Sequence, residues 1–203
     1  MSANPVNPLR IYAETLLPTV FGELRLRVYR QTDHVAGETT EPLAIVSRRL
    51  NRQSPVNVRI HSACLTSEVF GSCKCDCKQQ LDAALAIIAA EEGVVIYLHQ
   101  EGRGIGLGDK VRVYAMQEQG YDTIEANEVL GFAVDQRDYL YALAILRDLG
   151  ISRINLMTNN PEKIRAFEGS GIEVCSRVQL ITTPQPQARS YLDTKRDRMG
   201  HLL

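Results

Sequence analysis

Four of the five cysteines are crowded between Cys64 and Cys77, in the pattern C-x8-C-x-C-x-C. Residues two apart on an extended chain point to the same side, so Cys75 and Cys77 could both reach one metal ion. Thiolates favour zinc over magnesium or calcium, and in a reducing cytosol such crowding favours metal binding over disulfides. The spacing therefore predicts zinc, but it leaves open a catalytic site with three protein ligands, a closed structural site with four, or buried free thiols.

Two turns contain groups that could bind an anion. Residues 99–108, H-Q-E-G-R-G-I-G-L-G, follow an expected strand and precede a helix, so backbone amides and Arg103 could hold phosphate. The segment lacks the third glycine of a dinucleotide-binding loop and the Gly-Lys-Ser/Thr of a Walker A loop. Residues 158–163, T-N-N-P-E-K, open a second helix, where Lys163 would face an anion. An ordinary strand-to-helix turn and an ordinary helix cap are the alternatives.

Residues 135–138, D-Q-R-D, allow two interpretations. Asp138 can start the next helix as a cap, because aspartate is favoured at helix starts. Alternatively, Asp135 and Arg137 form a working acid–cation pair. The sequence alone does not separate the two.

The composition is that of an ordinary globular protein and excludes several classes. The 203 residues are 44% hydrophobic, and 23 Lys and Arg nearly balance 24 Asp and Glu. No global basic field exists, and only 6% of residues are aromatic, with no Trp, so we expect no nucleic-acid partner. The longest apolar run, Ala83 to Ala90, is too short to span a bilayer, and Met1 to Arg10 lacks the apolar core of a signal peptide. We expect a cytoplasmic protein that binds no membrane.

The hydrophobic rhythm predicts a β-rich amino-terminal part followed by alternating strands and helices. This order predicts an α/β fold in which helices cover a mixed sheet, in a single domain of residues 1–203, with residues 1–9 and 182–190 flexible. A polar, turn-like segment is expected over Thr32–Thr40. Strands are predicted over Arg10–Thr15, Glu23–Arg30, Pro42–Val46, Val56–Ile60, Val94–Leu98, Ile154–Met157 and within Ile172–Ile181. Helices are predicted from the Asp76 cap to a stop at Gly93, from the glycine-rich turn to Gly120, over Tyr139–Leu149, and from Pro161 to about Glu168.

Read together, these segments resemble the GTP cyclohydrolase II family, in order from about Leu17 to Leu203. Residues 59–66, R-I-H-S-A-C-L-T, resemble its R-x-H-S-x-C-L-T signature, and K-C-D-C at 74–77 resembles its R-C-D-C. Further similar segments are Q-E-G-R-G-I-G at 100–106, Q-G-Y-D-T-I-E-A-N at 119–127, L-G-F-A-V-D-Q-R-D at 130–138, T-N-N-P at 158–161, and the tail segments Y-L-D-T-K at 191–195 and M-G-H-L-L at 199–203.

The resemblance implies an enzyme that opens the imidazole ring of GTP and releases formate and pyrophosphate, leaving a phosphoribosylated diaminopyrimidine, as the first step of riboflavin biosynthesis. It implies one catalytic Zn²⁺ per chain, Mg²⁺ with the triphosphate, and a homodimer. Its zinc ligands fall on Cys64, Cys75 and Cys77, with Cys73 a bystander. Its proton acceptor falls on Asp135, its proposed nucleophile on Arg137, and a further catalytic tyrosine on Tyr114. Its GTP contacts fall on Arg59, Ile60, His61, Ser62, Ala63, Gln80, Glu101, Gly102, Arg103, Thr123, Thr158 and Lys163.

Some positions depart from the family pattern. Lys74 stands where arginine is usual, Lys78 where glycine is usual, and Cys73 is an additional cysteine. These departures leave open a paralogue that retains the formyl group or serves another pathway, although Tyr114 favours full deformylation. A structural-zinc binding module is the alternative from another class.

Overall fold

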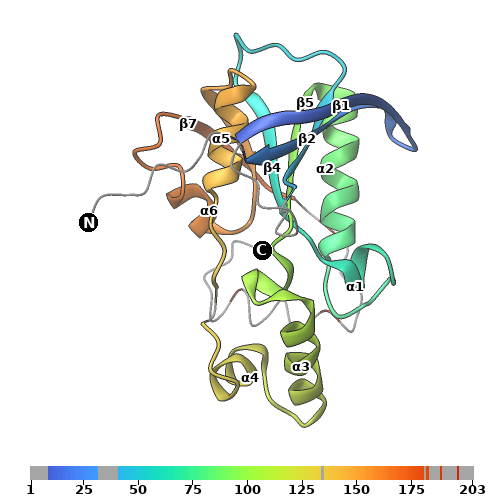
Figure 1. Cartoon of the computed structure of the whole chain (residues 1–203), viewed down its shortest axis with the longest axis vertical. Helices are drawn as coiled ribbons and strands as arrows, with labels where there is room; N and C mark the ends of the chain where they lie inside the picture. The colour runs from blue at the N-terminus through green and yellow to red at the C-terminus, as the bar shows by residue number, and fades with distance from the viewer. Residues whose placement is uncertain are drawn as a thin grey trace.

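The computed structural model describes residues 9–31, 41–133 and 135–180, together with the single residues 182, 188 and 196. Its centre is one seven-stranded mixed sheet with the order β1-β2-β3-β5-β4-β6-β7. The half from β1 to β5 is antiparallel, whereas β5, β4, β6 and β7 run parallel. Helices pack on both sides of this sheet, and α3 and α4 lie beyond one end of it (Figure 1). The predicted α/β fold with a mixed sheet is confirmed.

The strands follow the β-branched and apolar runs of the sequence. Their bounds are β1 Leu9–Thr19, β2 Gly22–Gln31, β3 Leu43–Ser47, β4 Val56–Ser62, β5 Gly93–Leu98, β6 Arg153–Met157 and β7 Glu173–Val178. The first two predicted strands, β1 and β2, pair as a hairpin, closed by a turn in which the Thr19 hydroxyl donates to the Gly22 carbonyl at 2.7 Å. The central strand β5 is a continuous apolar run that is buried on both faces, as expected in a parallel sheet. Its neighbour β4 is also largely buried, but it alternates Val56, Val58 and Ile60 with the polar residues Asn57, Arg59 and His61.

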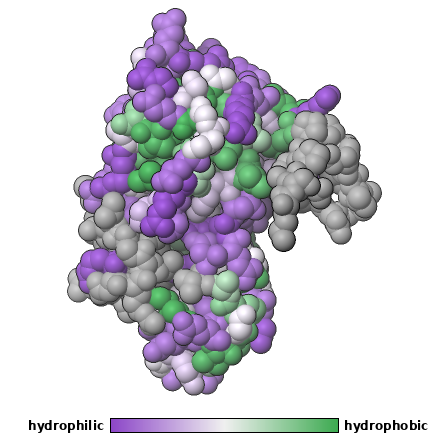
Figure 2. Space-filling view, turned by 90° about the vertical axis from the view of Figure 1, so that its left-hand side faces the viewer, coloured by the Kyte–Doolittle hydropathy of each residue, from purple (hydrophilic) through white to green (hydrophobic). Residues whose placement is uncertain are grey.

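The helices are α1 Leu65–Glu68, α2 Cys77–Glu91, α3 Gly106–Glu118, α4 Thr123–Val129, α5 Leu140–Asp148 and α6 Pro161–Arg165, with a 3₁₀ turn, η1, over Glu101–Gly104. None of the described helices is long and apolar enough to cross a membrane. On the face shown in Figure 2, apolar and hydrophilic residues are interspersed rather than gathered into one extended patch.

Alternate residues of the central strands supply two hydrophobic cores. Val94 and Ile96 of β5 face α5, whose Ile145 and Leu146 are fully buried. Val95, between them, faces the opposite side, where Ala84 and Ile88 of α2 pack. The sheet is therefore rigidly held between α2 and α5, which fixes the ends of β4, β5 and β6 relative to one another.

Two expectations about element boundaries need correction. Gly93 does not stop α2, which ends at Glu91; Gly93 instead begins β5, where a Cβ would lie 2.4 Å from the Asn57 carbonyl oxygen of β4. Helix α4 was not predicted at all, although Asp122 and Glu125 form a reciprocal capping box at its start. The expected turn over Thr32–Thr40 lies outside the described residues, as do the segments expected to be flexible, apart from Leu9 in β1, Thr182 and Ala188.

Candidate active site

The carboxyl ends of three neighbouring parallel strands open onto one cavity. β4, β5 and β6 end at Ser62, Leu98 and Met157, and the segments that follow them line a cavity of about 510 Å³. In the sheet, β5 and β6 are the two neighbours of β4, one on each side. The connection from β4 to β5 and the later connection into β6 therefore run to opposite sides of β4. A crevice at such a reversal is where open α/β sheets bind ligands. Residues of α3 and α4 form the far wall of this cavity.

Three cysteines meet at the edge of the cavity. Cys64 follows β4, and Cys75 and Cys77 flank Asp76 at the start of α2; their sulfurs all lie within 4.8 Å of one another. The Cys64 and Cys75 sulfurs are 3.7 Å apart. Two sulfurs bound tetrahedrally to one zinc ion at about 2.3 Å would be separated by about 3.8 Å, so this donor set fits zinc.

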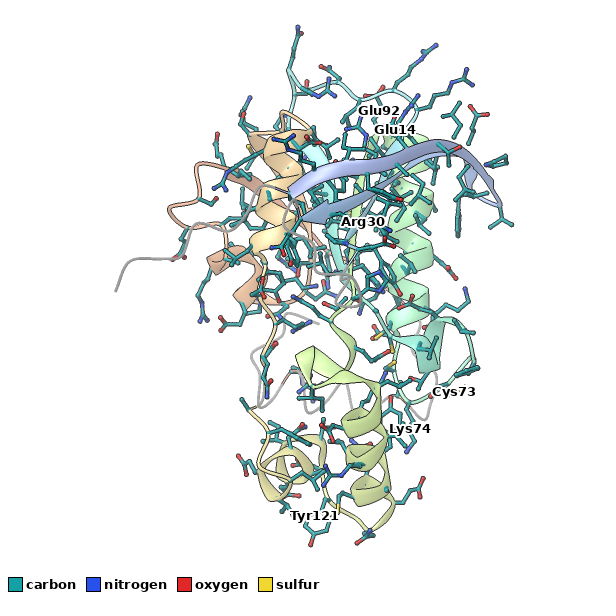
Figure 3. All side chains as sticks on the ribbon, in the orientation of Figure 1. Glu14, Arg30, Cys73, Lys74, Glu92 and Tyr121 are labelled. Atoms are coloured by element: carbon teal, nitrogen blue, oxygen red, sulfur yellow. The ribbon has the colours of Figure 1, made fainter. Side chains whose placement is uncertain are left out.

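The fourth clustered cysteine lies apart from this group. Cys73 is exposed, and its thiol lies 3.8 Å from the Gly71 carbonyl oxygen. Figure 3 shows Cys73 on the outer side of the loop after α1, whereas Lys74, the next residue, lies close to α3. The described cysteines therefore form a cluster of three rather than four, which is consistent with a zinc site that keeps one position open.

The thiols differ in their readiness to ionise. Hydrogen bonds from the Cys75 and Cys77 thiols lower the pKa of Cys64, and the Lys110 ammonium, 3.1 Å from the Cys64 sulfur, lowers it further. The same contact with Cys64 raises the pKa of Cys75. Cys64 is therefore the thiol of the cluster that its surroundings most favour in the ionised form, and a thiolate is the form that binds a metal.

The Glu68 carboxylate fixes the backbone of Cys64 by accepting a hydrogen bond from its amide. One of its carboxylate oxygens accepts the Cys64 amide at 2.8 Å and lies 3.0 Å from His61 Nε2, and the other accepts the Tyr97 hydroxyl at 2.9 Å. Burial lowers the pKa of His61, so a neutral imidazole donates from Nε2 to Glu68. Burial would raise the pKa of Glu68, but the hydrogen bond from His61 and its other donors lower it overall. Glu68 is therefore an ionised anchor for the first zinc-ligand candidate.

The glycine-rich turn is fastened to the cysteine loop through Glu101. The Glu101 carboxylate accepts the Leu65 amide at 2.7 Å, the Gly102 amide at 3.0 Å and the Lys110 ammonium at 2.7 Å. Gly102 and Arg103 both adopt left-handed backbone conformations, with φ of 61° and 63°, which Arg103 can hold only at a cost in strain. The turn is further tied down because the Arg103 carbonyl accepts the Gln136 amide at 2.9 Å.

Asp135 and Arg137 form an ion pair, which is one of the two interpretations that the sequence allowed for residues 135–138. Arg137 Nε lies 2.9 Å from Asp135 Oδ1, and a second guanidinium nitrogen contacts the other carboxylate oxygen. Burial would raise the pKa of Asp135, but hydrogen bonds from Arg137 lower it below its usual value. Arg137 lines the cavity, whereas Asp135 lies behind it. The N-cap of the next helix is Tyr139 rather than Asp138, although the Asp138 carboxylate accepts the Leu140 amide at 3.1 Å.

Two buried cations lie between the sheet and the cavity. Arg59 donates to the Met157 carbonyl at 2.9 Å and to Gln80 Oε1 at 2.5 Å, and burial lowers its pKa to about 10. Lys163 donates to the Ile60 carbonyl at 2.7 Å and lines the cavity beside Thr158. The Ile60 side chain itself is fully buried in the core, so this residue contributes to the site through its backbone.

The far wall of the cavity contains Tyr114 of α3 and Thr123, the first residue of α4. Burial raises the pKa of Tyr114 to about 12, so its hydroxyl stays protonated at neutral pH. The Lys74 ammonium lies 4.9 Å from the centre of the Tyr114 ring, so one of the departures from the family pattern touches a predicted catalytic residue. Gln117 donates to the Thr123 hydroxyl at 2.9 Å, which orients that side chain.

The cavity collects most of the residues that the sequence singled out. Of the eighteen predicted positions, Ile60 and Asp135 do not line it. The other sixteen do: Arg59, His61, Ser62, Ala63, Cys64, Cys75, Cys77, Gln80, Glu101, Gly102, Arg103, Tyr114, Thr123, Arg137, Thr158 and Lys163. Sequence reasoning missed Glu68, Tyr97 and Lys110, which contact these residues without belonging to the recognised functional set.

Several buried polar atoms on the wall have no hydrogen-bond partner within the described residues. They are Arg59 Nε, His61 Nδ1, Ser62 Oγ and Gln100 Oε1. Unpaired buried polar atoms are rare because each is costly, and these four belong to residues that line the same cavity. Donors and acceptors are both present among them.

A mixed α/β sheet with a three-thiol cluster beside a polar cavity at its carboxyl edge is the arrangement of an α/β protein with a candidate zinc site. The sequence model of GTP cyclohydrolase II matches residues 10–179, and the chain belongs to that enzyme family.

Curated relatives agree with this assignment. The chain is 48% identical to the riboflavin biosynthesis protein RibBA of Bacillus cereus, over 94% of this chain and 47% of that protein. It is 47% identical to RibBA of Aquifex aeolicus, over 94% of this chain and 46% of that protein. The chain thus spans about half the length of the curated relatives it matches. A two-domain RibBX structure from A. baumannii aligns with a TM-score of 0.47 and 17% identity, over 87% of this chain and 41% of that one, which is too distant to inform the site.

Proposed function

We propose that this chain hydrolyses GTP by opening the imidazole ring, releasing formate and pyrophosphate, as a step of riboflavin biosynthesis. The observation that carries the proposal is the cluster of three cysteine sulfurs at the edge of a cavity that also contains Arg137 and Lys163. Ring opening needs an activated water at C8 of the purine, and pyrophosphate release needs cations at the phosphates. One cavity offers groups suited to both tasks.

Cys64, Cys75 and Cys77 would hold the zinc ion. A zinc ion bound there supplies the Lewis acidity that makes water nucleophilic near neutral pH. Cys64 and Cys75 are buried and Cys77 is half-buried, so the cluster is shielded on the protein side and reached from the cavity. Glu68 and Glu101 fix the two backbone amides at Cys64 and Leu65, which orients the first ligand.

The phosphates would lie against the cations at the opposite side of the strand ends. Arg103, Arg137 and Lys163 line the cavity, as does Arg59, which is held by the Met157 carbonyl. Mg²⁺ bound with the triphosphate would supply further positive charge, since magnesium is usually held through substrate phosphates and water. The neutral His61 ring and the Ser62 hydroxyl would contact the nucleoside portion.

Arg137 acts, in our proposal, by stabilising charge on the phosphate rather than by attacking it. A guanidinium has a pKa above about 12, so a nucleophilic role requires a strong base beside it. The pKa of Asp135 is lowered by Arg137, and a weakened base is poorly suited to take that proton. Asp135 would instead orient the guanidinium, while Arg137 stabilises negative charge that develops during attack by water.

Tyr114 would position the opened ring for removal of the formyl group. Its hydroxyl remains protonated at neutral pH, because burial raises its pKa to about 12, so it can donate a hydrogen bond to a formamide. This role is the reason for preferring full deformylation over the formyl-retaining alternative. A homodimer and a cytoplasmic location are further expectations from the family resemblance.

The direct test is to incubate the purified protein with GTP and Mg²⁺ and to analyse the products by mass. The proposal predicts a diaminopyrimidine nucleotide together with formate and pyrophosphate. A formamido product that accumulates without formate would favour the formyl-retaining paralogue. Zinc bound in stoichiometric amount with no turnover of GTP would favour the structural-zinc module.

A further inference from the structure

Lys110 of α3 occupies a position to which neither the family pattern nor the proposed mechanism assigns a task. It is 8% exposed, and its ammonium contacts three acceptors: the Cys64 sulfur at 3.1 Å, the Thr66 hydroxyl at 2.9 Å and a Glu101 carboxylate oxygen at 2.7 Å. An ammonium has three donors, so all of them are used. Burying this charge would be costly without such partners, and the arrangement is therefore specific.

The contact with sulfur has an electronic consequence for a bound metal. Three thiolates around one divalent zinc ion would leave one net negative charge, and electron-rich sulfur ligands weaken the Lewis acidity of the metal. A hydrogen bond from a fixed cation draws electron density away from the sulfur that accepts it. Glu101 keeps the ammonium in place, because its carboxylate is itself held by the Leu65 and Gly102 amides.

We propose that Lys110 is a positioning residue of the zinc site, which orients the Cys64 thiolate through an N–H···S hydrogen bond and limits how much charge that thiolate donates to zinc. The inference rests on the proposed function, since it presupposes a metal at the three cysteines. Lys110 thereby also links the cysteine loop after β4 to the glycine-rich turn after β5.

A second lysine near the cluster provides a matched control. Lys78 follows Cys77 directly in the sequence, but its ammonium is exposed and pairs with Asp82 at 2.8 Å on the outer face of α2. Replacing Lys78 therefore removes a positive charge close to the cluster in sequence without removing a hydrogen bond to sulfur. Lys110→Met retains most of the side-chain length but no donor, and Lys110→Gln retains a neutral donor.

The experiment replaces zinc with Co²⁺ in the parent protein and in the three variants, and records metal content, the thiolate-to-cobalt charge-transfer band and the kinetics with GTP. We expect Lys110→Met to keep about one metal ion per chain and to shift the band to longer wavelength, because its sulfur is more electron-rich. Lys110→Gln should fall between Lys110→Met and the parent, and Lys78→Met should match the parent. The zinc form of Lys110→Met should lose about ten- to a hundredfold in kcat with a smaller change in KM, the usual range for partners of metal ligands.

The outcomes distinguish a failure of the proposed function from a failure of the role of Lys110. A parent protein that binds no metal overturns the proposed function itself. A metal-loaded parent whose band and kcat are unchanged in Lys110→Met overturns only the role of Lys110. If Lys110→Met does not fold, Lys110→Gln is used instead. A charge-transfer band of cobalt-loaded Lys110→Gln at the same wavelength as in the parent would then contradict the role of Lys110.

Discussion

Cys64 is constrained at its backbone and at its sulfur by different residues. Glu68 accepts its amide, whereas Lys110 and the Cys75 thiol contact its sulfur. A ligand held in this way loses little conformational freedom when a metal binds, so the free energy of binding is not spent on ordering the loop. Cys73 is exposed and, within the described residues, is not held by such contacts at its backbone and sulfur, so it is not a pre-ordered metal ligand.

Replacing each clustered cysteine by serine should therefore divide them into two groups. We expect Cys64→Ser, Cys75→Ser and Cys77→Ser to lose zinc and ring opening, because serine is a poor zinc ligand. Cys73→Ser should retain about one zinc ion per chain and the parent activity. Metal analysis of the desalted variants checks this, and loss of zinc from Cys73→Ser would show that all four thiols take part.

Tyr114→Phe tests the second hydrolytic step. The change removes a hydroxyl and keeps the ring, so the fold and the zinc content should persist. Ring opening should continue more readily than deformylation, and the formamido compound should accumulate, heavier than the final product by one CO unit in the mass spectrum. A variant that deformylates at the parent rate would mean that Tyr114 only packs against Lys74 and its other neighbours.

Arg137→Ala tests the phosphate chemistry separately from the ring chemistry. Removal of the guanidinium leaves developing negative charge on phosphate unstabilised, and loss of one such group commonly costs on the order of a hundredfold or more in rate. Pyrophosphate release should fall accordingly, measured with a coupled phosphate assay. Arg112→Ala, which removes an exposed guanidinium paired with Asp109, is the control. Pyrophosphate release at the parent rate by Arg137→Ala would exclude that residue from the mechanism.

At the scale of the elements, the site depends on three loops that follow β4, β5 and β6 and on the short helix α4. The loops are fixed by sheet register, because β4 pairs with both β5 and β6. Helix α4 has no such support, and its start is held by the capping box of Asp122 and Glu125. Thr123, which lines the cavity, is the first residue of that helix.

Asp122→Ala should therefore affect both stability and substrate binding. Asp122 accepts the Ile124 amide at 2.6 Å and the Glu125 amide at 2.9 Å, and loss of such a cap costs about 1 kcal/mol. We expect that loss in urea unfolding, with a severalfold higher KM for GTP because Thr123 is no longer held. Asp109→Ala, which removes only an exposed ion pair with Arg112, should change stability by less than about 0.5 kcal/mol. Equal effects of the two changes would mean that the cap does not support the site.

The sequence predicted those parts of this arrangement that have a local signal. The strands and three of the long helices follow hydrophobic periodicity, and the cysteine spacing indicated a metal. Helix α4 was missed because it is short and amphipathic rhythm is weak over seven residues, although D-x-x-E at 122–125 is a capping signal that could have revealed it. Glu68 and Lys110 could not be found in this way, since their partners are set by tertiary contacts with Cys64 and Glu101.

At the scale of the whole molecule, the cavity lies between two parts of the structure. The sheet, the start of α2, α6 and the segment after β4 carry the cysteines and the buried cations, while α3 and α4, beyond one end of the sheet, carry Tyr114 and Thr123 (Figure 1). A substrate in this cavity would touch both parts. Ring opening is therefore expected to depend on the cysteine cluster and phosphate chemistry on Arg137, within one cavity.

The most direct measurement follows formate release by NMR from GTP labelled with ¹³C at C8, in protein stripped of metal and then reloaded with increasing zinc. The account predicts no labelled formate from the stripped protein, and a rate that rises in proportion to bound zinc until about one ion per chain is present. Pyrophosphate release should persist without zinc, because it is assigned to Arg137. Formate released at an undiminished rate by the stripped protein, or none from the fully loaded protein, would contradict the central claim.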